Sequence, residues 1–234
     1  DAERMLANLD RNSFEIADCY EGVDAVVVNT CGFIDEAKQE AIENILEMAQ
    51  LKEDGIVGKI IVSGCLSERY KEQIFEEMPE VDAVIGIGAI GRIDEVVRRT
   101  LKGERILDIP SKDELPLCGE RLLTTPEYWA YLKIADGCSN RCAYCAIPGI
   151  RGDYRSVEMD MLVEETRQLA AVRQGDFTAD RGIDRRHFDV RKADRRSGGG
   201  RQQNEKRTSL VVEILPVSRR LERWPAAQPY GAFV

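Results

Sequence analysis

Apolar and polar positions follow two alternating patterns over the first hundred residues. Short β-branched apolar runs, typical of strands buried on both faces, lie at 24–29, 59–63 and 81–86. After each run, apolar residues recur every three or four positions, as on one face of a helix, over 37–49, 67–78 and 91–101. Three βα units in succession predict a small parallel sheet with helices packed on it.

The pattern divides the chain into segments of different character. Residues 1–103 are the predicted α/β domain with a Rossmann-like parallel sheet, and 104–126 form a linker interrupted by prolines. Residues 127–171 begin a second domain, with a predicted strand at 128–135 and an amphipathic helix at 157–171.

The last segment, residues 172–234, differs in charge and in pattern. It contains 14 Lys+Arg and 8 Asp+Glu, whereas residues 1–171 contain 19 and 34. Helical and strand periodicity is lost except at Ser209 to Leu215, so we predict a disordered tail. Two explanations stay open: out-of-frame translation after a frameshift near residue 172, and a basic arm that binds nucleic acid.

Seven cysteines occur without a signal for export, which favours metal or redox chemistry over disulfides. No apolar run approaches the roughly 20 residues needed to cross a bilayer, so we expect a cytoplasmic protein with no membrane partner. The sequence does not begin with Met, and we expect it to be part of a longer protein.

Three cysteines lie within eight residues directly after the strand predicted at 128–135. They are Cys138, Cys142 and Cys145, in the spacing C-x₃-C-x₂-C. Structural zinc normally takes four protein ligands, whereas three thiolates suit a cubane iron–sulfur cluster with one open iron. A zinc site completed by a distant residue such as Cys118 is the alternative.

Two more cysteines follow predicted strands. Cys31 comes after the strand at 24–29, and Cys65 after the strand at 59–63, each beside a glycine. The carboxyl ends of parallel strands meet at one edge of a sheet, where α/β folds place ligands. These cysteines are therefore either ligands at that edge or buried small apolar residues.

The C-x₃-C-x₂-C loop, with an aromatic residue before its last cysteine, resembles the cluster loop of the radical S-adenosylmethionine superfamily. Together with the preceding α/β domain, it makes the chain similar to the methylthiotransferase family. The resemblance implies that 127–171 starts a radical S-adenosylmethionine βα barrel. It also implies two [4Fe–4S] clusters, one held with S-adenosylmethionine by Cys138, Cys142 and Cys145, and an auxiliary one held by Cys31, Cys65 and a cysteine upstream of Asp1.

Within that family, the run from Asn29 to Lys38 and the run from Ile147 to Gly152 are similar to the branch that modifies a ribosomal protein. This implies methylthiolation of the β-carbon of an aspartate in ribosomal protein uS12. The implied partners are uS12 or the small ribosomal subunit and an electron donor such as flavodoxin or ferredoxin, with the enzyme a monomer. The resemblance implies that Tyr144 lies near the adenine of S-adenosylmethionine, with ordinary loop packing as the alternative. Arg151 and Arg155 are candidates to bind the cofactor carboxylate or an acidic substrate residue, because Arg suits bidentate carboxylate binding, or they form surface salt bridges.

Two other functions remain open: a methylthiotransferase that modifies tRNA, and a non-catalytic metal-binding module with a nucleic-acid-binding tail. Only 89 residues follow Cys145, fewer than the roughly 200–250 of a usual βα barrel. We therefore expect an inactive fragment, and we assign no catalytic residue.

Overall fold

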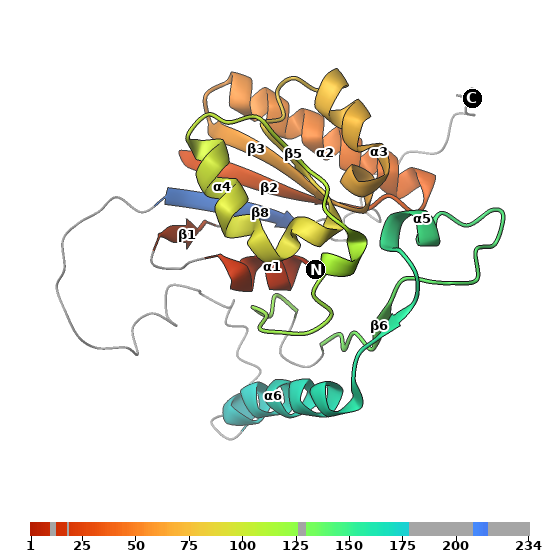
Figure 1. The fold of residues 1–234 in the computed structure, drawn as a ribbon. Coiled ribbons are helices and arrows are strands. Elements are labelled where there is room, and N and C mark those ends of the chain that lie inside the picture. The colour runs from red at the N-terminus through yellow and green to blue at the C-terminus, as the bar shows by residue number, and fades with distance from the viewer. Residues whose placement is uncertain (10–12, 18, 126–129, 178–207, 215–234) are drawn as a thin grey trace, which may run out of the picture.

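A parallel sheet of six strands forms the centre of the molecule, in the order β1-β8-β2-β3-β4-β5 (Figure 1). The computed structural model describes residues 1–9, 13–17, 19–125, 130–177 and 208–214. The strands are β1 (Phe14–Ile16), β2 (Val23–Thr30), β3 (Val57–Gly64), β4 (Ala83–Ile85), β5 (Ile106–Asp108) and β8 (Thr208–Ile214). The three predicted strands are β2, β3 and β4, and the predicted α/β fold is confirmed.

Helices cover both faces of this sheet (Figure 1). On one face α2 (Asp35–Glu53) and α3 (Cys65–Glu77) pack against one hydrophobic cluster, which includes Val26 and Val62. On the other face α1 (Ala2–Asn8), the 3₁₀ helix η1 (Ile87–Arg92) and α4 (Ile93–Leu101) pack against a second cluster, which includes Val27 and Ile61. Neighbouring strand residues therefore enter opposite clusters, as the pleat of a strand requires.

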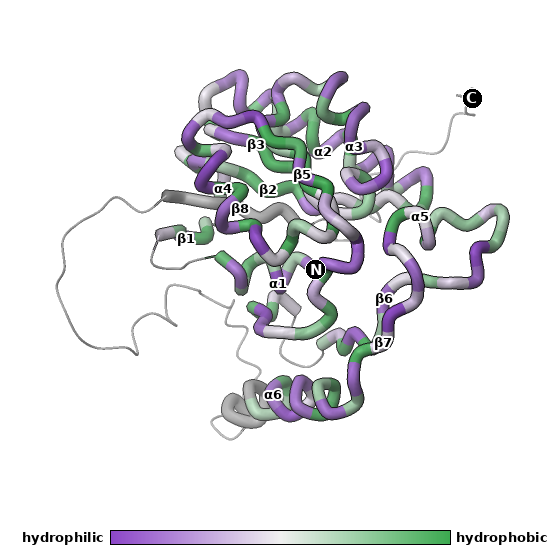
Figure 2. The backbone as a smooth tube through the Cα atoms, in the orientation of Figure 1, coloured by the Kyte–Doolittle hydropathy of each residue, from purple (hydrophilic) through white to green (hydrophobic). Residues whose placement is uncertain are grey.

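The central strands are continuously apolar because neither of their faces meets water. Val26, Val27, Val28, Ile60 and Ile61 have no exposed surface. Figure 2 shows the same contrast along the tube, with β2 and β3 largely hydrophobic and the helices alternating between hydrophobic and hydrophilic residues.

The sheet extends beyond the strands that the sequence pattern predicted. Residues Ile106–Asp108, within the predicted linker, pair with β4 as the edge strand β5. At the other edge, β1 and α1 precede the first predicted strand. The one patterned stretch of the tail forms β8, which pairs in parallel with both β1 and β2. The rest of the predicted disordered tail lies outside the described residues, except that the helix predicted at 157–171 continues as α6 (Met159–Phe177).

The segment after the linker contains short elements. Instead of a strand over 128–135, the structure has a two-residue strand β6 (Ala135–Asp136), paired antiparallel with β7 (Arg155–Ser156). The helix α5 (Ile147–Arg151) lies between them. A barrel strand needs a parallel neighbour, and β6 has only β7 beside it in the described residues. The predicted start of a βα barrel is therefore not confirmed, and residues 126–129 lie outside the description.

Candidate functional site

Cys31 and Cys65 lie side by side at the carboxyl-end edge of the sheet. Thr30 and Gly64, the last residues of β2 and β3, are direct partners in the parallel register. The residues that follow them, Cys31 and Cys65, therefore lie next to each other. A side chain at Gly32 would bring its Cβ within 2.8 Å of the backbone of Cys65. Glycine therefore allows the two turns to touch. We call Cys31, Gly32, Gly64 and Cys65 the cysteine edge.

Hydrogen bonds fix the backbone of the cysteine edge. The Thr30 hydroxyl donates to the carbonyl of Ser63 at 2.6 Å. Ser67 Oγ lies 2.9 Å from the carbonyl of Gly64 and 2.7 Å from the carbonyl of Ile85. Across the edge, Arg69 Nη1 donates to the carbonyl of Gly32 at 3.2 Å. The two turns are thus held by neighbouring side chains on α3 and β2.

The thiols of the cysteine edge differ in their surroundings. Cys65, the first residue of α3, is 4% exposed, whereas Cys31 is half-buried. Burial raises the pKa of the Cys65 thiol, and the charge and hydrogen bond of Arg151 oppose this rise. Cys31 also raises the pKa of Cys65, as expected of two acidic groups close together.

The loop that carries Cys138, Cys142 and Cys145 is closed at its base by two glycines. Gly137 has φ +73°, and a Cβ there would lie 2.1 Å from the carbonyl oxygen of Asp153. The amide of Cys138 donates to the carbonyl of Gly152 at 3.1 Å, and Gly152 itself has φ +80°. The loop leaves β6 and returns to the molecule through α5 (Figure 1).

The three loop thiols are free and accessible. Cys142 is exposed, Cys138 and Cys145 are half-buried, and the amide of Cys145 donates to the carbonyl of Cys142 at 3.0 Å. Tyr144, the predicted adenine contact, is 92% exposed. Within the described residues, no three Cys, His, Asp or Glu side chains are gathered as a metal site.

The donor set of the loop fits an iron–sulfur cluster by its chemistry. It offers three soft thiolates and contains no histidine or carboxylate between them. Cys118, the residue that could complete a zinc site, has its sulfur 3.5 Å from the sulfur of Met161 on α6. The thiols therefore suit the cluster by their chemistry, although their side chains are not close enough together in the described residues to form a metal site.

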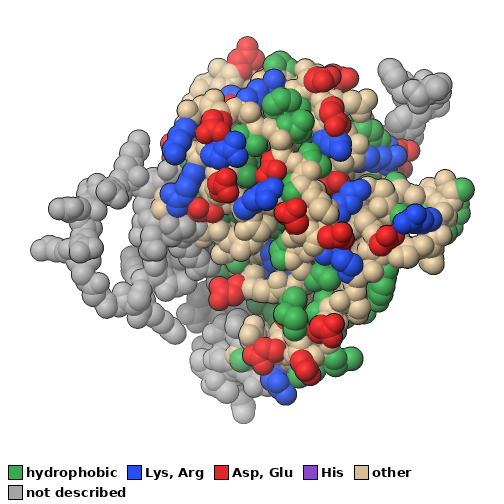
Figure 3. Space-filling model, in the orientation of Figure 1, with side chains coloured by type: hydrophobic (Ala, Val, Ile, Leu, Met, Phe, Trp, Pro, Cys, Tyr) green, Lys and Arg blue, Asp and Glu red, His purple; other side chains and the backbone are tan. Residues whose placement is uncertain are grey.

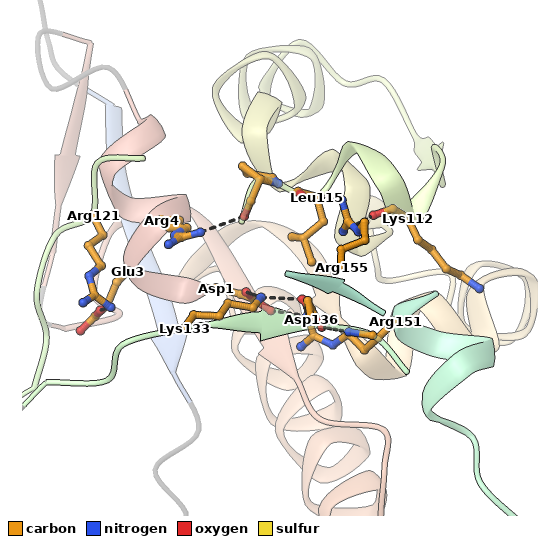
Figure 4. A network of polar contacts seen from close by, with 12 residues as sticks. Asp1, Glu3, Arg4, Lys112, Leu115, Arg121, Lys133, Asp136, Arg151 and Arg155 are labelled. Carbon is orange, nitrogen blue, oxygen red and sulfur yellow. Dashed lines mark hydrogen bonds and ion pairs between the residues drawn. The ribbon is translucent and has the colours of Figure 1, made fainter. Parts of the chain in front are cut away.

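Two arginines that follow the loop point back into the protein (Figure 4). Arg151 Nη1 donates to Asp1 Oδ2 at 2.6 Å and to Asp136 Oδ2 at 3.4 Å. Arg155 donates to the carbonyls of the segment around Lys112, including that of Asp113 at 2.7 Å. Arg155 thus anchors the segment around Lys112, while Arg151 joins Asp136 of β6 to Asp1 at the start of α1.

The partners of Arg151 were not identified from the sequence. Asp136 stands two residues before Cys138, and this closeness was the one available signal. Asp1 is 150 positions from Arg151 in the chain, so no local pattern indicates their contact.

A surface hollow of about 390 Å³ lies beside β5 and α4, and no cysteine is among the residues that line it. Its side chains pair with one another, as in the bidentate Arg92–Asp108 contact and the Arg99–Glu104 pair at 2.8 Å. These charges are already satisfied, so the hollow offers no group aimed at a ligand.

Comparisons with known proteins match the part of the chain that holds both sets of cysteines. Residues 1–86 match the family described as Uncharacterized protein family UPF0004. Over 170 residues, 72% of this chain, the sequence is 45% identical to the ribosomal protein uS12 methylthiotransferase RimO of Thermoanaerobacter sp. (strain X514). The matched part of the chain is therefore similar to the RimO methylthiotransferases.

Other RimO proteins give the same result. The RimO of Lachnoclostridium phytofermentans is 47% identical over 171 residues, and that of Clostridioides difficile 40% over 175 residues, each covering 73% of this chain. The chain spans only 38–39% of the length of these curated RimO relatives. Among the described residues, no helix combines the length and apolar character needed to span a bilayer.

Proposed function

We propose that this chain is part of a radical S-adenosylmethionine methylthiotransferase that acts on ribosomal protein uS12. The similarity to RimO proteins over 72% of the chain carries this proposal. The finer reaction is methylthiolation of the β-carbon of an aspartate. Its partners are uS12 or the small ribosomal subunit and a flavodoxin or ferredoxin as electron donor, and the enzyme acts in the cytoplasm as a monomer.

In this proposal Cys138, Cys142 and Cys145 hold a [4Fe–4S] cluster, and Cys31 and Cys65 provide two ligands of a second one. If bound there together with S-adenosylmethionine, such a cluster would supply one-electron, radical chemistry on that cofactor. The protein's own contribution is placement. The Gly137–Gly152 base fixes where the loop begins and ends, and α5 packs against α3, which starts at Cys65.

The chain by itself is proposed to bind cofactors without completing turnover. A radical must be enclosed so that it meets only its substrate carbon. In the described residues the loop projects from a two-stranded antiparallel pair, and no closed barrel surrounds it.

The described face of the N-terminal α/β domain does not itself favour nucleic-acid binding, while most of the tail that the alternative function invokes lies outside the described residues. On the face drawn in Figure 3, basic and acidic side chains alternate over the described residues without an extended basic area. Exposed ion pairs such as Arg98–Asp94 and Arg99–Glu104 account for part of this alternation. A nucleic-acid interface uses a basic patch or stripe instead.

Metal content tests the proposal directly. After anaerobic reconstitution with iron and sulfide, we expect the loop site to hold about four irons with matching acid-labile sulfide. Cys142→Ala should lose these irons because two thiolates no longer enclose the cluster. Cys118→Ala, which removes a thiol outside both sites, should keep them. Zinc in place of iron, or full iron in Cys142→Ala, would contradict the proposal.

A further inference from the structure

Residues 109–116, within the predicted linker, are packed onto the α/β domain, and we call them the strap. The strap contains the 3₁₀ helix η2 (Lys112–Glu114). A Cβ on Gly88 would lie 2.2 Å from the carbonyl oxygen of Ser111, so glycine lets η1 and the strap touch through their backbones. Leu115 is 2% exposed and belongs to the cluster under α1, η1 and α4. The strap therefore differs from a flexible spacer, which makes few contacts with the domains it connects.

One side chain of the strap reaches a buried acid of the α/β domain. Lys112 Nζ lies 3.9 Å from Glu68 Oε1, and the side chain of Glu68, on α3, is 4% exposed. The other carboxylate oxygen of Glu68 accepts a hydrogen bond from the amide of Ile87 at 3.1 Å. A buried carboxylate needs such partners because it has lost its hydration. Glu68 thus links Lys112 to both α3 and η1.

The same lysine also contacts the helix that follows the cysteine loop. Lys112 Nζ donates a hydrogen bond to the carbonyl of Gly149 in α5. A Cβ on Gly152 would lie 3.4 Å from Lys112 Cβ, which is ordinary contact distance. Lys112 therefore lies between Glu68 on the sheet side and α5 on the loop side.

Arg155 holds the backbone of the strap from the loop side (Figure 4). Its Nη1 donates to the carbonyl of Asp113 at 2.7 Å and to that of Leu115 at 3.3 Å. Its Nη2 donates to the carbonyl of Lys112 at 3.0 Å. A planar guanidinium has several donors in fixed directions, so one side chain can bind three carbonyls of a turn only in one arrangement.

The two cations contact the cysteine loop at its entry and at its exit. Arg155 pairs with Asp136 in the β6–β7 ladder, and Asp136 stands two residues before Cys138. Gly149 stands four residues after Cys145. The strap is therefore bonded to both ends of the segment that carries the three cysteines.

We propose that the strap is a clasp that holds the cysteine loop at one place on the α/β domain before any cofactor binds, with Arg155 and Lys112 as its positioning residues. This assignment differs from carboxylate binding by Arg155, because both of its Nη atoms already donate to strap carbonyls. The inference rests on the proposed function only in taking the loop as the cofactor site.

Amide hydrogen exchange on the full chain without metal tests the clasp. For Arg155→Gln we expect about tenfold faster exchange in the peptides covering 109–116 and 138–152, because several charged hydrogen bonds between them are lost. The β3 peptide, 59–64, should be unchanged. Faster exchange on both sides distinguishes a clasp from local loosening of β7. Exchange in either of the two peptides within about twofold of the parent would overturn the clasp.

Arg141→Gln is the matched control, because Arg141 belongs to the cysteine loop but does not contact the strap. Its side chain is 72% exposed and lies 3.1 Å from Asp153, which is 61% exposed. Exposed pairs contribute little, so exchange in both peptides should stay within about twofold of the parent. Equal acceleration in Arg141→Gln and Arg155→Gln would overturn the clasp.

Two further variants separate the contributions of Arg155 and Lys112. Arg155→Lys keeps the charge but loses the planar fork, so its exchange should rise about as much as in Arg155→Gln. Lys112→Met removes the ammonium and should speed exchange in the peptide 147–152 by about threefold, since one charged hydrogen bond is lost. Exchange like that of the parent in Arg155→Lys or in Lys112→Met would overturn the role of that residue.

The outcomes keep this inference apart from the proposed function. If the parent chain binds no iron after reconstitution, the proposed function fails, whereas faster exchange in Arg155→Gln still supports the clasp. If the parent binds iron but its exchange is insensitive to Arg155→Gln, the clasp alone is wrong. If Arg155→Gln does not fold, Arg155→Lys and Lys112→Met decide, and exchange like that of the parent in both would overturn the inference.

Discussion

Asp82 joins three neighbouring elements of the N-terminal sheet through one carboxylate. It precedes β4 and accepts hydrogen bonds from Lys59 at 2.9 Å, from the amide of Ile60 at 2.9 Å, and from Lys52 on α2. Burial alone would raise the pKa of Asp82, but the bonds from Lys52, Ile60 and Lys59 outweigh it and hold the pKa below its ordinary value.

The depressed pKa of Asp82 predicts how stability depends on pH. A carboxylate with a lowered folded-state pKa stabilises the protein above its unfolded-state pKa of about 4, and this contribution disappears as pH falls through the folded-state pKa. Asp82→Asn should therefore lower the free energy of unfolding by about 1–3 kcal/mol at pH 7. The difference from the parent should shrink below about pH 4.

Urea unfolding at several pH values measures this difference. Asp54→Asn, at an exposed position, serves as the control and should change the free energy at pH 7 by less than about 0.5 kcal/mol. A loss in Asp82→Asn that persists undiminished at low pH would show that the carboxylate charge is not its origin.

At the scale of the elements, the conformation of the cysteine loop depends on the two glycines at its base, Gly137 and Gly152. Gly137 combines a positive φ with a Cβ position only 2.1 Å from the carbonyl of Asp153. Any side chain there must displace the backbone that receives the loop. Gly149, within α5, has no atom within 4 Å of its Cβ position and no positive φ.

Gly137→Ala should therefore open the base of the loop. We expect limited proteolysis within 138–151 to become at least about tenfold faster, because strain of a few kcal/mol falls on this base. The matched variant Gly149→Ala should be neutral or slightly protective, since alanine favours a helix over glycine. Equal proteolysis rates in the two variants would contradict the importance of the base.

At the scale of the whole molecule, α6 is attached through a buried charged cluster. Glu165 on α6 contacts Arg121 at 3.2 Å and Arg4 of α1 at 3.5 Å. Arg4 also donates to the carbonyl of Pro116 at 2.9 Å, so the cluster joins α1, the segment around Pro116 in the predicted linker, and α6. Arg4 is 4% exposed and Glu165 8%.

Removing Glu165 from this cluster should be costly. Glu165→Gln leaves the buried Arg4 without its carboxylate and leaves Arg121 with Glu3 alone, at 3.5 Å, and loss of one partner of a buried pair costs about 3–5 kcal/mol. The adjacent variant Glu164→Gln changes a side chain that is 57% exposed and should cost less than about 1 kcal/mol. Denaturant unfolding of both variants compares them, and equal losses would mean that α6 is not held by this cluster.

The sequence by itself determined the elements whose pattern is local. The strands β2, β3 and β4 are covered on both faces, so their residues form continuous apolar runs. These runs predict the strands without any knowledge of the tertiary structure. The spacing of Cys138, Cys142 and Cys145 is likewise a property of eight consecutive residues. The placement of Cys31 and Cys65 at one edge followed from parallel pairing, because strands in one direction end on the same side.

Only the tertiary structure decided the features that depend on distant residues. The strand β5 is three residues long and becomes a strand because β4 offers it hydrogen-bonding partners. Residues 128–135 were predicted as a strand, but β6 is limited to the two residues opposite β7, since a strand needs a paired neighbour. Arg151 is hydrogen-bonded to Asp1, which lies 150 residues away in the chain. The sequence does not predict this contact, because ion pairs form between side chains that are close in space and not in sequence.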